Sequence, residues 1–156
     1  MEVIRELSEY ELERDKHMPS KNHGKLQYRI SKAIGDLYED RFDILTEVSL
    51  DIPSRPLVPD IALFAVKESD WLEDEIKVKE PPLGIAEILS PTQGNQELVD
   101  KMETYFSFGI KSCWIVIPTF QMIHVFSDKH TYKTYMQNEL YDEILDIRLD
   151  LKRIFR

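Results

Sequence analysis

Two runs of the sequence have the pattern of strands in the interior of a β-sheet, and each contains one acidic residue. The runs are "LVPDIALFAV" (residues 57–66) and "LGIAEILS" (residues 83–90), and their acids are Asp60 and Glu87. A strand that is apolar on both faces fits the centre of a covered sheet. An ionised carboxylate is costly to bury alone, so each acid needs a cation, a proton or hydrogen-bond donors.

The two acids together indicate a metal site. If the two runs form neighbouring strands, about 4.8 Å separates them, and Asp60 and Glu87 can both reach one divalent ion such as Mg²⁺ or Mn²⁺. For either acid alone a structural alternative is open: Asp60 would cap the turn after Pro59, and Glu87 would pair with a basic side chain at the strand end. A pair of carboxylates in apolar strands favours a functional site over this alternative.

A lysine in the next helix points towards the same place. Residues 96–108 carry apolar side chains at helical spacing and are followed by a glycine, which is typical of a helix C-terminus. At about 100° per residue, Lys101 falls inside the arc of Leu98, Met102 and Tyr105, so we expect its side chain to face the sheet. The alternative is a lysine whose stem packs on the apolar face while its amine reaches water.

The remaining pattern predicts an α/β (α+β) chain with the order helix, three strands, helix and several C-terminal strands. The expected elements are a helix at 25–40 capped by Asn22 or Ser20, strands at 42–52, 57–66 and 83–90, a helix at 96–108, and strands at 112–118, 122–127, 131–136 and 144–151. Residues 67–82 are charged and end in two prolines, which predicts a long connection or a projecting hairpin. Strict alternation in the 42–52 strand favours a solvent-facing Glu47, and the alternative is that this carboxylate joins the metal site through a water.

Composition favours one domain spanning residues 1–156. Hydrophobic residues make up 42 % of the chain, which is enough for a packed core. No run approaches the roughly 18 apolar residues of a membrane span, and the first residues are too charged for a signal peptide, so we expect a cytoplasmic protein. The single cysteine, Cys113, excludes an internal disulfide and a cysteine-rich zinc site and is expected to be buried.

Charge is unevenly distributed along the chain. The formal net charge of −9 argues against broad affinity for nucleic acid. The segment from Arg14 to Lys32 is nevertheless rich in cations, and there His23, Lys25 and Arg29 are candidates for contacts with phosphates. The alternative is an ordinary solvated helix face.

A family resemblance rests on four segments of the sequence. They are "MPSKNHGKLQYRISKAIGDL", "VPDIALF", "PLGIAEILSPT" and "DKMETYFSFGIKSCWIVIP", and together they cover roughly residues 18 to 126. With these segments the chain resembles the bacterial restriction-endonuclease family, common in cyanobacteria, of the PD-(D/E)XK nuclease superfamily. The resemblance implies a restriction-endonuclease-like core: a helix, three antiparallel strands, a second helix and a further strand in one mixed sheet flanked by helices.

The resemblance also implies an activity and a set of site residues. It assigns Pro59-Asp60 to the PD element and Glu87 to the acidic position of a Mg²⁺- or Mn²⁺-dependent endonuclease, a hydrolase acting on DNA phosphodiester bonds. The chain departs from the superfamily at Leu89, where the motif lysine would stand. In the similar family the lysine lies on the following helix, which implies that Lys101 orients or activates the water.

Two other classes of function stay open at this point. The first is a catalytically inactive nuclease-like module that binds nucleic acid or protein, which the absent strand lysine and the acidic total charge favour. The second is a structural dimerisation domain that uses the C-terminal strands. Trp71, in the charged connection, could stack on a base or pack in a homodimer interface.

Overall fold

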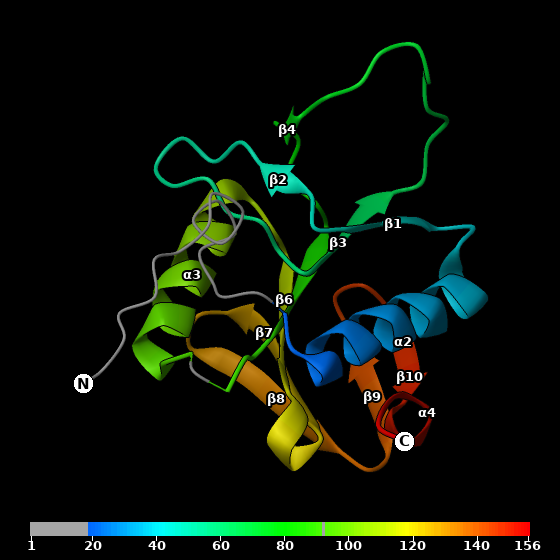
Figure 1. Cartoon of the computed structure of the whole chain (residues 1–156), viewed down its shortest axis with the longest axis vertical. Helices are drawn as coiled ribbons and strands as arrows, with labels where there is room; N and C mark the ends of the chain where they lie inside the picture. The colour runs from blue at the N-terminus through cyan, green and yellow to red at the C-terminus, as the bar shows by residue number, and fades with distance from the viewer. Residues whose placement is uncertain (1–18, 92) are drawn as a thin grey trace.

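A six-stranded mixed sheet organises the chain (Figure 1). The computed structural model describes residues 19–91 and 93–156, so Arg14, Lys16 and His17 of the expected basic segment lie outside the described residues. The strand order is β1-β3-β5-β6-β7-β8. The bounds are β1 Phe42–Thr46, β3 Ile61–Ala65, β5 Gly84–Ile88, β6 Ser112–Ile117, β7 Met122–Asp128 and β8 Thr131–Met136.

Pairing in this sheet is antiparallel except between β5 and β6. A parallel pair needs a crossover connection, and helix α3 (Asn95–Phe108) supplies it. Helix α3 ends at Gly109, whose φ of 112° is in the left-handed region that glycine adopts without strain. The mixed sheet flanked by helices, expected from the resemblance, is confirmed.

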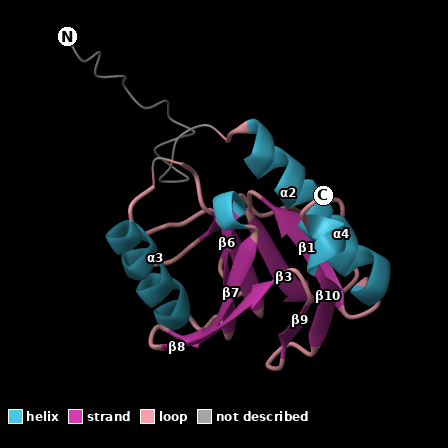
Figure 2. Ribbon diagram, turned by 90° about the horizontal axis from the view of Figure 1, so that it is seen from below, coloured by secondary structure: helices cyan, strands magenta, loops and turns pink. Residues whose placement is uncertain are grey.

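Helices cover both faces of the sheet (Figure 2). Helix α2 (Lys21–Tyr38) packs on one face, and the Ser20 hydroxyl caps it by accepting a hydrogen bond from the His23 N–H at 3.2 Å. The same face holds β9 (Glu139–Asp142), β10 (Ile147–Asp150) and the short helix α4 (Leu151–Ile154). Helix α3 packs on the opposite face over a second apolar cluster.

The expected strand at 42–52 is broken in two. Its first half is β1, but Glu47 has a φ of 56°, and this left-handed residue turns the chain out of the sheet. The second half, β2 (Ser49–Leu50), pairs in parallel with β4 (Lys77–Val78). Strict alternation therefore does not hold across Glu47, and the side chain does not take the solvent-facing position that alternation predicts.

The C-terminal region also differs from the expected strands. Strand β9 is not among them, and the 144–151 run forms a turn, β10 and the start of α4. The carboxylate of Asp142 stabilises the turn by accepting the Ile144 and Leu145 N–H groups at 2.9 and 3.0 Å. The Asp150 side chain caps α4 by accepting the Lys152 N–H at 3.0 Å. These side-chain acceptors interrupt a pattern in which alternation alone predicts one strand.

Residues 66–83 form the projecting connection between β3 and β5, here called the arm. It extends away from the sheet in Figure 1 and is held at its base by β4 and by the ion pair of Lys67 with Glu80 at 3.2 Å. Trp71, within the arm, is 92 % exposed. None of the helices among the described residues is long and apolar enough to cross a membrane.

Candidate active site

Three carboxylates meet where strands β1, β3 and β5 lie side by side. Ile61, the residue after Asp60, pairs on one side with the residue before Glu47 and on the other with the residue before Glu87. When the register is continued by one residue, Asp60 lies opposite Glu47 on one side and opposite Glu87 on the other. Neighbouring strands of a sheet are about 4.8 Å apart. The expected neighbourhood of the Asp60 and Glu87 strands is therefore present, and Glu47 joins them.

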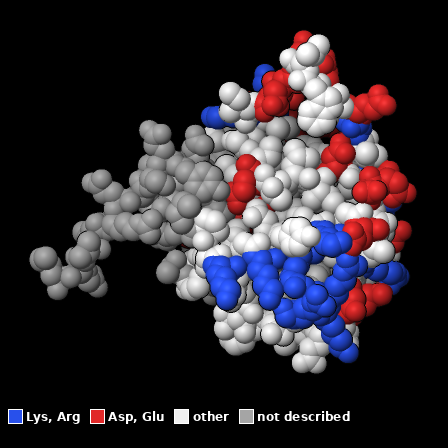
Figure 3. All heavy atoms as spheres, turned by 45° about the vertical axis from the view of Figure 1, so that its right-hand side comes forward, with Lys and Arg blue, Asp and Glu red and all other residues white. Residues whose placement is uncertain are grey.

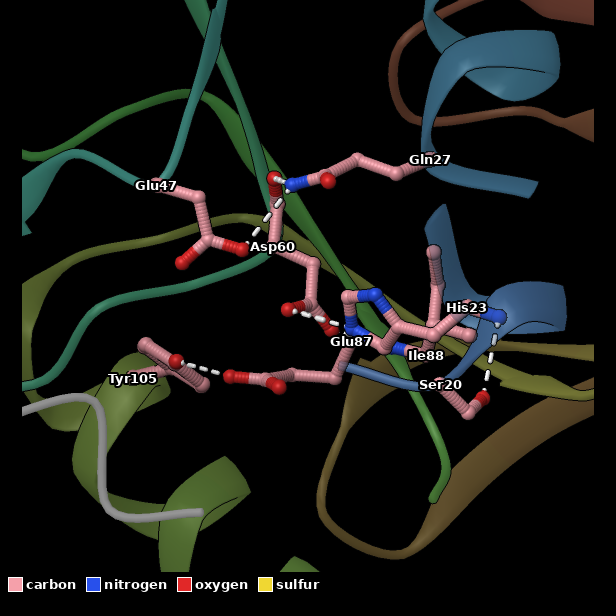
Figure 4. A network of polar contacts seen from close by, with 8 residues as sticks. All are labelled: Ser20, His23, Gln27, Glu47, Asp60, Glu87, Ile88 and Tyr105. Carbon is pink, nitrogen blue, oxygen red and sulfur yellow. Dashed lines mark hydrogen bonds and ion pairs between the residues drawn. The ribbon is translucent and has the colours of Figure 1, made fainter. Parts of the chain in front are cut away.

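Asp60 is fully buried and has contacts on both carboxylate oxygens (Figure 4). Its Oδ2 accepts the backbone N–H of Ile88 at 2.7 Å, and its Oδ1 lies 2.8 Å from Nε2 of His23. The imidazole comes from the first turn of α2 and is only 2 % exposed. The structure thus places His23, a candidate for phosphate contact, directly against the central carboxylate.

Gln27 links helix α2 to two of the three strands. Its Nε2 donates to Oε1 of Glu47 at 3.0 Å and to the backbone carbonyl of Asp60 at 2.8 Å. Gln27 follows His23 by four residues, so both side chains leave the same face of the helix. Glu47 is half-buried and hydrogen-bonded in this cluster, which corrects the expectation that its carboxylate faces solvent.

Helix α3 contributes two buried side chains to the site. Tyr105 is fully buried and its hydroxyl donates a short hydrogen bond to Oε1 of Glu87. Lys101 stands one turn earlier on the same buried face and is 1 % exposed. Its amine therefore does not reach water as a lysine at a protein surface does. Leu89, where the superfamily has its lysine, packs with the apolar cluster under α3.

The electrostatics of the site keep the Tyr105 phenol protonated. Burial raises its pKa well above the usual value of 10.0, and the negative charges of Glu87 and then Asp60 raise it further. A phenol that keeps its proton is a permanent donor to Glu87. Tyr105 therefore fixes the rotamer of a carboxylate that the sequence pattern singled out.

The donor set fits a divalent cation. One ligand atom from each of His23, Glu47 and Asp60 lies within 4.8 Å of the other two. Two carboxylate oxygens suit hard cations such as Mg²⁺ and Mn²⁺, and the imidazole nitrogen adds a ligand that transition metals prefer. Glu87 is outside this threefold group, although the strand register makes it a neighbour of Asp60.

The two other candidates for nucleic-acid contact lie on the outside of α2. Lys25 is exposed, and Arg29 is half-buried with its Nη1 donating to the carbonyl of Arg153 at 3.3 Å. Neither belongs to the carboxylate cluster, from which they are separated by the width of the helix.

Sequence reasoning missed two contributors to the site, Gln27 and Tyr105, and favoured solvent over the site for a third, Glu47. Gln27 had a signal, since it follows His23 at a spacing of four on a predicted helix. Tyr105 lies inside the apolar arc beside Lys101, where the pattern indicates a core residue. Glu47 was considered only as a contributor through a water, because a left-handed residue inside an alternating run leaves no trace in the pattern.

Comparisons with known proteins agree with this fold. The crystal structure of "a putative nuclease belonging to DUF820 from Anabaena variabilis ATCC 29413" superposes with a TM-score of 0.75 at 18 % sequence identity, covering 88 % of this chain and 82 % of that one. At this identity the likeness establishes the fold alone. No curated protein matched the sequence. A family model described as "Putative restriction endonuclease", the Uma2 family, matches residues 5–151. The chain therefore belongs to the Uma2 family of restriction-endonuclease-like proteins.

Proposed function

We propose that the protein is a metal-dependent endonuclease that hydrolyses DNA phosphodiester bonds, and that residues 1–156 act as one catalytic domain. The observation that carries the proposal is the cluster of the buried Asp60 and Glu87 and the half-buried Glu47 at adjoining strands, with the buried His23 of α2 against Asp60. Carboxylates gathered in this way need a cation, a shared proton or hydrogen-bond donors, and one divalent ion would satisfy several of them together. Family membership supports the nuclease class.

Asp60 and Glu87 are the proposed metal ligands, with His23 and Glu47 completing the donor set. A bound Mg²⁺ or Mn²⁺ supplies the Lewis acidity that lowers the pKa of a water and offsets charge on the phosphate. Gln27 orients Glu47 by donating to it at 3.0 Å. Tyr105 orients Glu87 in the same way from the other face of the sheet. The Gln27 amide and the Tyr105 phenol would thus hold the two carboxylates in the orientation that a shared metal ion requires.

Lys101 is the proposed third catalytic residue. Its helix face carries Tyr105, which touches Glu87, so the amine enters the site from α3 in place of the lysine absent at Leu89. An ammonium group beside the scissile phosphate would stabilise the negative charge that builds on its oxygens and orient the attacking water. Lys25 and Arg29, on the outer face of α2, are the proposed phosphate contacts along the substrate. We further propose that the protein is located in the cytoplasm and acts as a homodimer.

The alternative function is a nuclease-like module that binds nucleic acid or protein without cleaving it. The observation in its favour is Leu89, which leaves no lysine on the strand that carries Glu87. The endonuclease function requires that a metal ion binds and that Lys101 is needed for cleavage, whereas the binding module requires neither.

A thermal-shift measurement tests the metal. We expect Mn²⁺ or Mg²⁺ to raise the melting temperature of the wild type, because a ligand at about 100 times its Kd stabilises the fold by roughly 2.7 kcal/mol. Asp60→Asn or Glu87→Gln should abolish that shift. An unchanged melting temperature of the wild type with either metal favours the non-catalytic module.

A cleavage assay tests Lys101. Supercoiled plasmid and single-stranded DNA are incubated with Mn²⁺ and either wild type or Lys101→Ala, purified in parallel. We expect cleavage by the wild type and a loss of about 10²- to 10³-fold in the variant. Equal cleavage by both preparations would mean a contaminating nuclease and would end the assignment of Lys101.

A further inference from the structure

The outer face of α2 carries a stripe of cations that the carboxylate cluster does not use. Lys21, Lys25, Arg29 and Lys32 are spaced by four, four and three residues, so they leave one side of the helix. From the first to the last the helix rises by about 16 Å. This length equals roughly five steps of 3.4 Å along one strand of a DNA duplex.

The C-terminal helix extends the stripe sideways. The carbonyl of Arg153 accepts the hydrogen bond from Arg29 at 3.3 Å, which fixes α4 beside α2. Lys152, Arg153 and Arg156 are all exposed there. Asp36 lies between the helices and pairs with Lys32 at 2.8 Å and with Arg153, and these two cations lower the pKa of its carboxyl. We call the four cations of α2 and the three of the C-terminus the basic ridge.

Basic side chains gather on one part of this side of the molecule. Figure 3 shows a continuous patch of Lys and Arg on the lower half of the face, bordered on the right by acidic side chains, with further acidic side chains at the top. The arm supplies the acidic end, because residues 68–75 hold Glu68, Asp70, Glu73, Asp74 and Glu75. A polyanion is repelled by the arm and attracted by the ridge, although the whole chain has a net charge of −9.

Helix α2 also connects the ridge to the candidate active site. His23 lies on the inner side of the same helix, 2.8 Å from Asp60, between Lys21 and Lys25 in sequence. A helix with its side chains is about 10–12 Å across, which is less than the width of a duplex. A DNA duplex is therefore wide enough to place one of its strands at the start of α2, near His23, while the rest of the duplex lies over the outer face of α2 towards α4.

We propose that the basic ridge binds the backbone of the DNA flanking the cleavage point, with α4 and Arg156 as its distal end. This inference rests on the proposed endonuclease function. The contacts are to phosphates, so the ridge contributes affinity and orientation without reading sequence. Each phosphate neutralised releases counterions, and the binding is expected to weaken steeply as salt rises.

The test measures binding of fluorescein-labelled duplexes of two unrelated sequences, in EDTA so that no cleavage occurs. The ridge variant is Lys152→Gln/Arg153→Gln/Arg156→Gln. A milder variant, Lys152→Gln/Arg156→Gln, leaves the Arg153–Asp36 ion pair in place should the triple variant fold poorly. The matched control removes three exposed cations near α3 and β8, Lys111→Gln/Lys129→Gln/Lys133→Gln, with the same change in net charge.

We expect the ridge variants to lose at least 10-fold in affinity at low salt, equally for both sequences. The slope of log affinity against log salt should fall by about one for each phosphate that the variant no longer neutralises. The control should bind as the wild type does. Equal affinity of ridge variant and control overturns the proposal, as does binding of phosphatidylglycerol vesicles without binding of DNA. Wild type that binds through the ridge yet never cleaves with Mn²⁺ would overturn the nuclease function and leave the ridge intact.

Discussion

Two buried carboxylate sites in this protein differ in what surrounds the acid. Asp142 is 1 % exposed and accepts four hydrogen bonds: from the Ser112 hydroxyl, the Trp114 indole at 2.7 Å, and two backbone N–H groups. All four donors are neutral and belong to fixed parts of the fold. Asp60 is equally buried, but its neighbours include the ring of His23 and the carboxylates on both adjoining strands.

These surroundings distinguish a structural acid from a candidate catalytic one. Neutral donors satisfy Asp142 and join the C-terminal strands to the central sheet, so this carboxylate has no capacity left for an ion. Around Asp60 negative charge accumulates, and a cation lowers the energy of the whole group. Burial of an acid is therefore a weak indicator of function, whereas burial together with other titratable groups is a strong one.

The largest expected effect is on catalysis. Asp60→Asn should reduce Mn²⁺-dependent cleavage by about 10³-fold or more, because it removes a ligand charge from the metal site. Without metal its free energy of unfolding should stay within about 1 kcal/mol of wild type, since a weaker interaction with His23 is offset by weaker repulsion among the acids. Plasmid cleavage and urea denaturation measure the two quantities. A severely destabilised Asp60→Asn would make this acid structural, like Asp142.

The next effect is on stability. Asp142→Ala leaves four buried donors without their acceptor and should lower the free energy of unfolding by about 3 kcal/mol, or roughly 6–12 °C in Tm. Glu143→Ala is the matched control, because its exposed pair with Lys133 contributes about 0–1 kcal/mol. Calorimetry on both variants measures the difference. Equal melting temperatures would show that the four hydrogen bonds to Asp142 do not stabilise the fold.

A smaller effect is expected at the support of Glu87. Tyr105→Phe removes the hydroxyl that holds this carboxylate and should weaken Mn²⁺ affinity by about 10- to 100-fold. Tyr135→Phe removes a comparable hydrogen bond, at 2.7 Å to the carbonyl of Tyr141, away from the site. Isothermal titration with Mn²⁺ compares the two. If both variants keep wild-type affinity, Tyr105 serves packing and not the orientation of Glu87.

The smallest effect concerns the buried thiol of Cys113, which the charges of Glu87 and Asp142 influence. Burial raises the pKa of Cys113 well above 9.0, with further contributions from the charges of Glu87 and Asp142. Above pH 9 the unfolded thiol ionises while the folded one does not, so the unfolded state binds fewer protons and stability falls as pH rises. The slope approaches about 1.4 kcal/mol per pH unit. Denaturation curves at pH 8 and 10 should show this loss in wild type relative to Cys113→Ala, and parallel pH profiles would contradict it.

Much of the fold could be predicted because its signals are periodic. The apolar runs predicted β3 and β5, and the helical spacing predicted that Lys101 faces the sheet, where its side chain is buried. Features that depend on single side chains could not be predicted. The left-handed backbone of Glu47 looks like any strand residue in the sequence. Asp142 gave no signal either, because its donors at Ser112 and Trp114 come from a strand 28 or more residues away.

The most direct measurement of the central claim is a Mn²⁺ titration of the wild type followed by electron paramagnetic resonance of the free ion. We predict one saturable site in the wild type and its loss in Asp60→Asn. Glu143→Gln, an exposed acid beside Asp142, should retain the site. No saturable binding by the wild type, or equal binding by Asp60→Asn, would contradict the assignment of a metal centre to the Asp60 cluster.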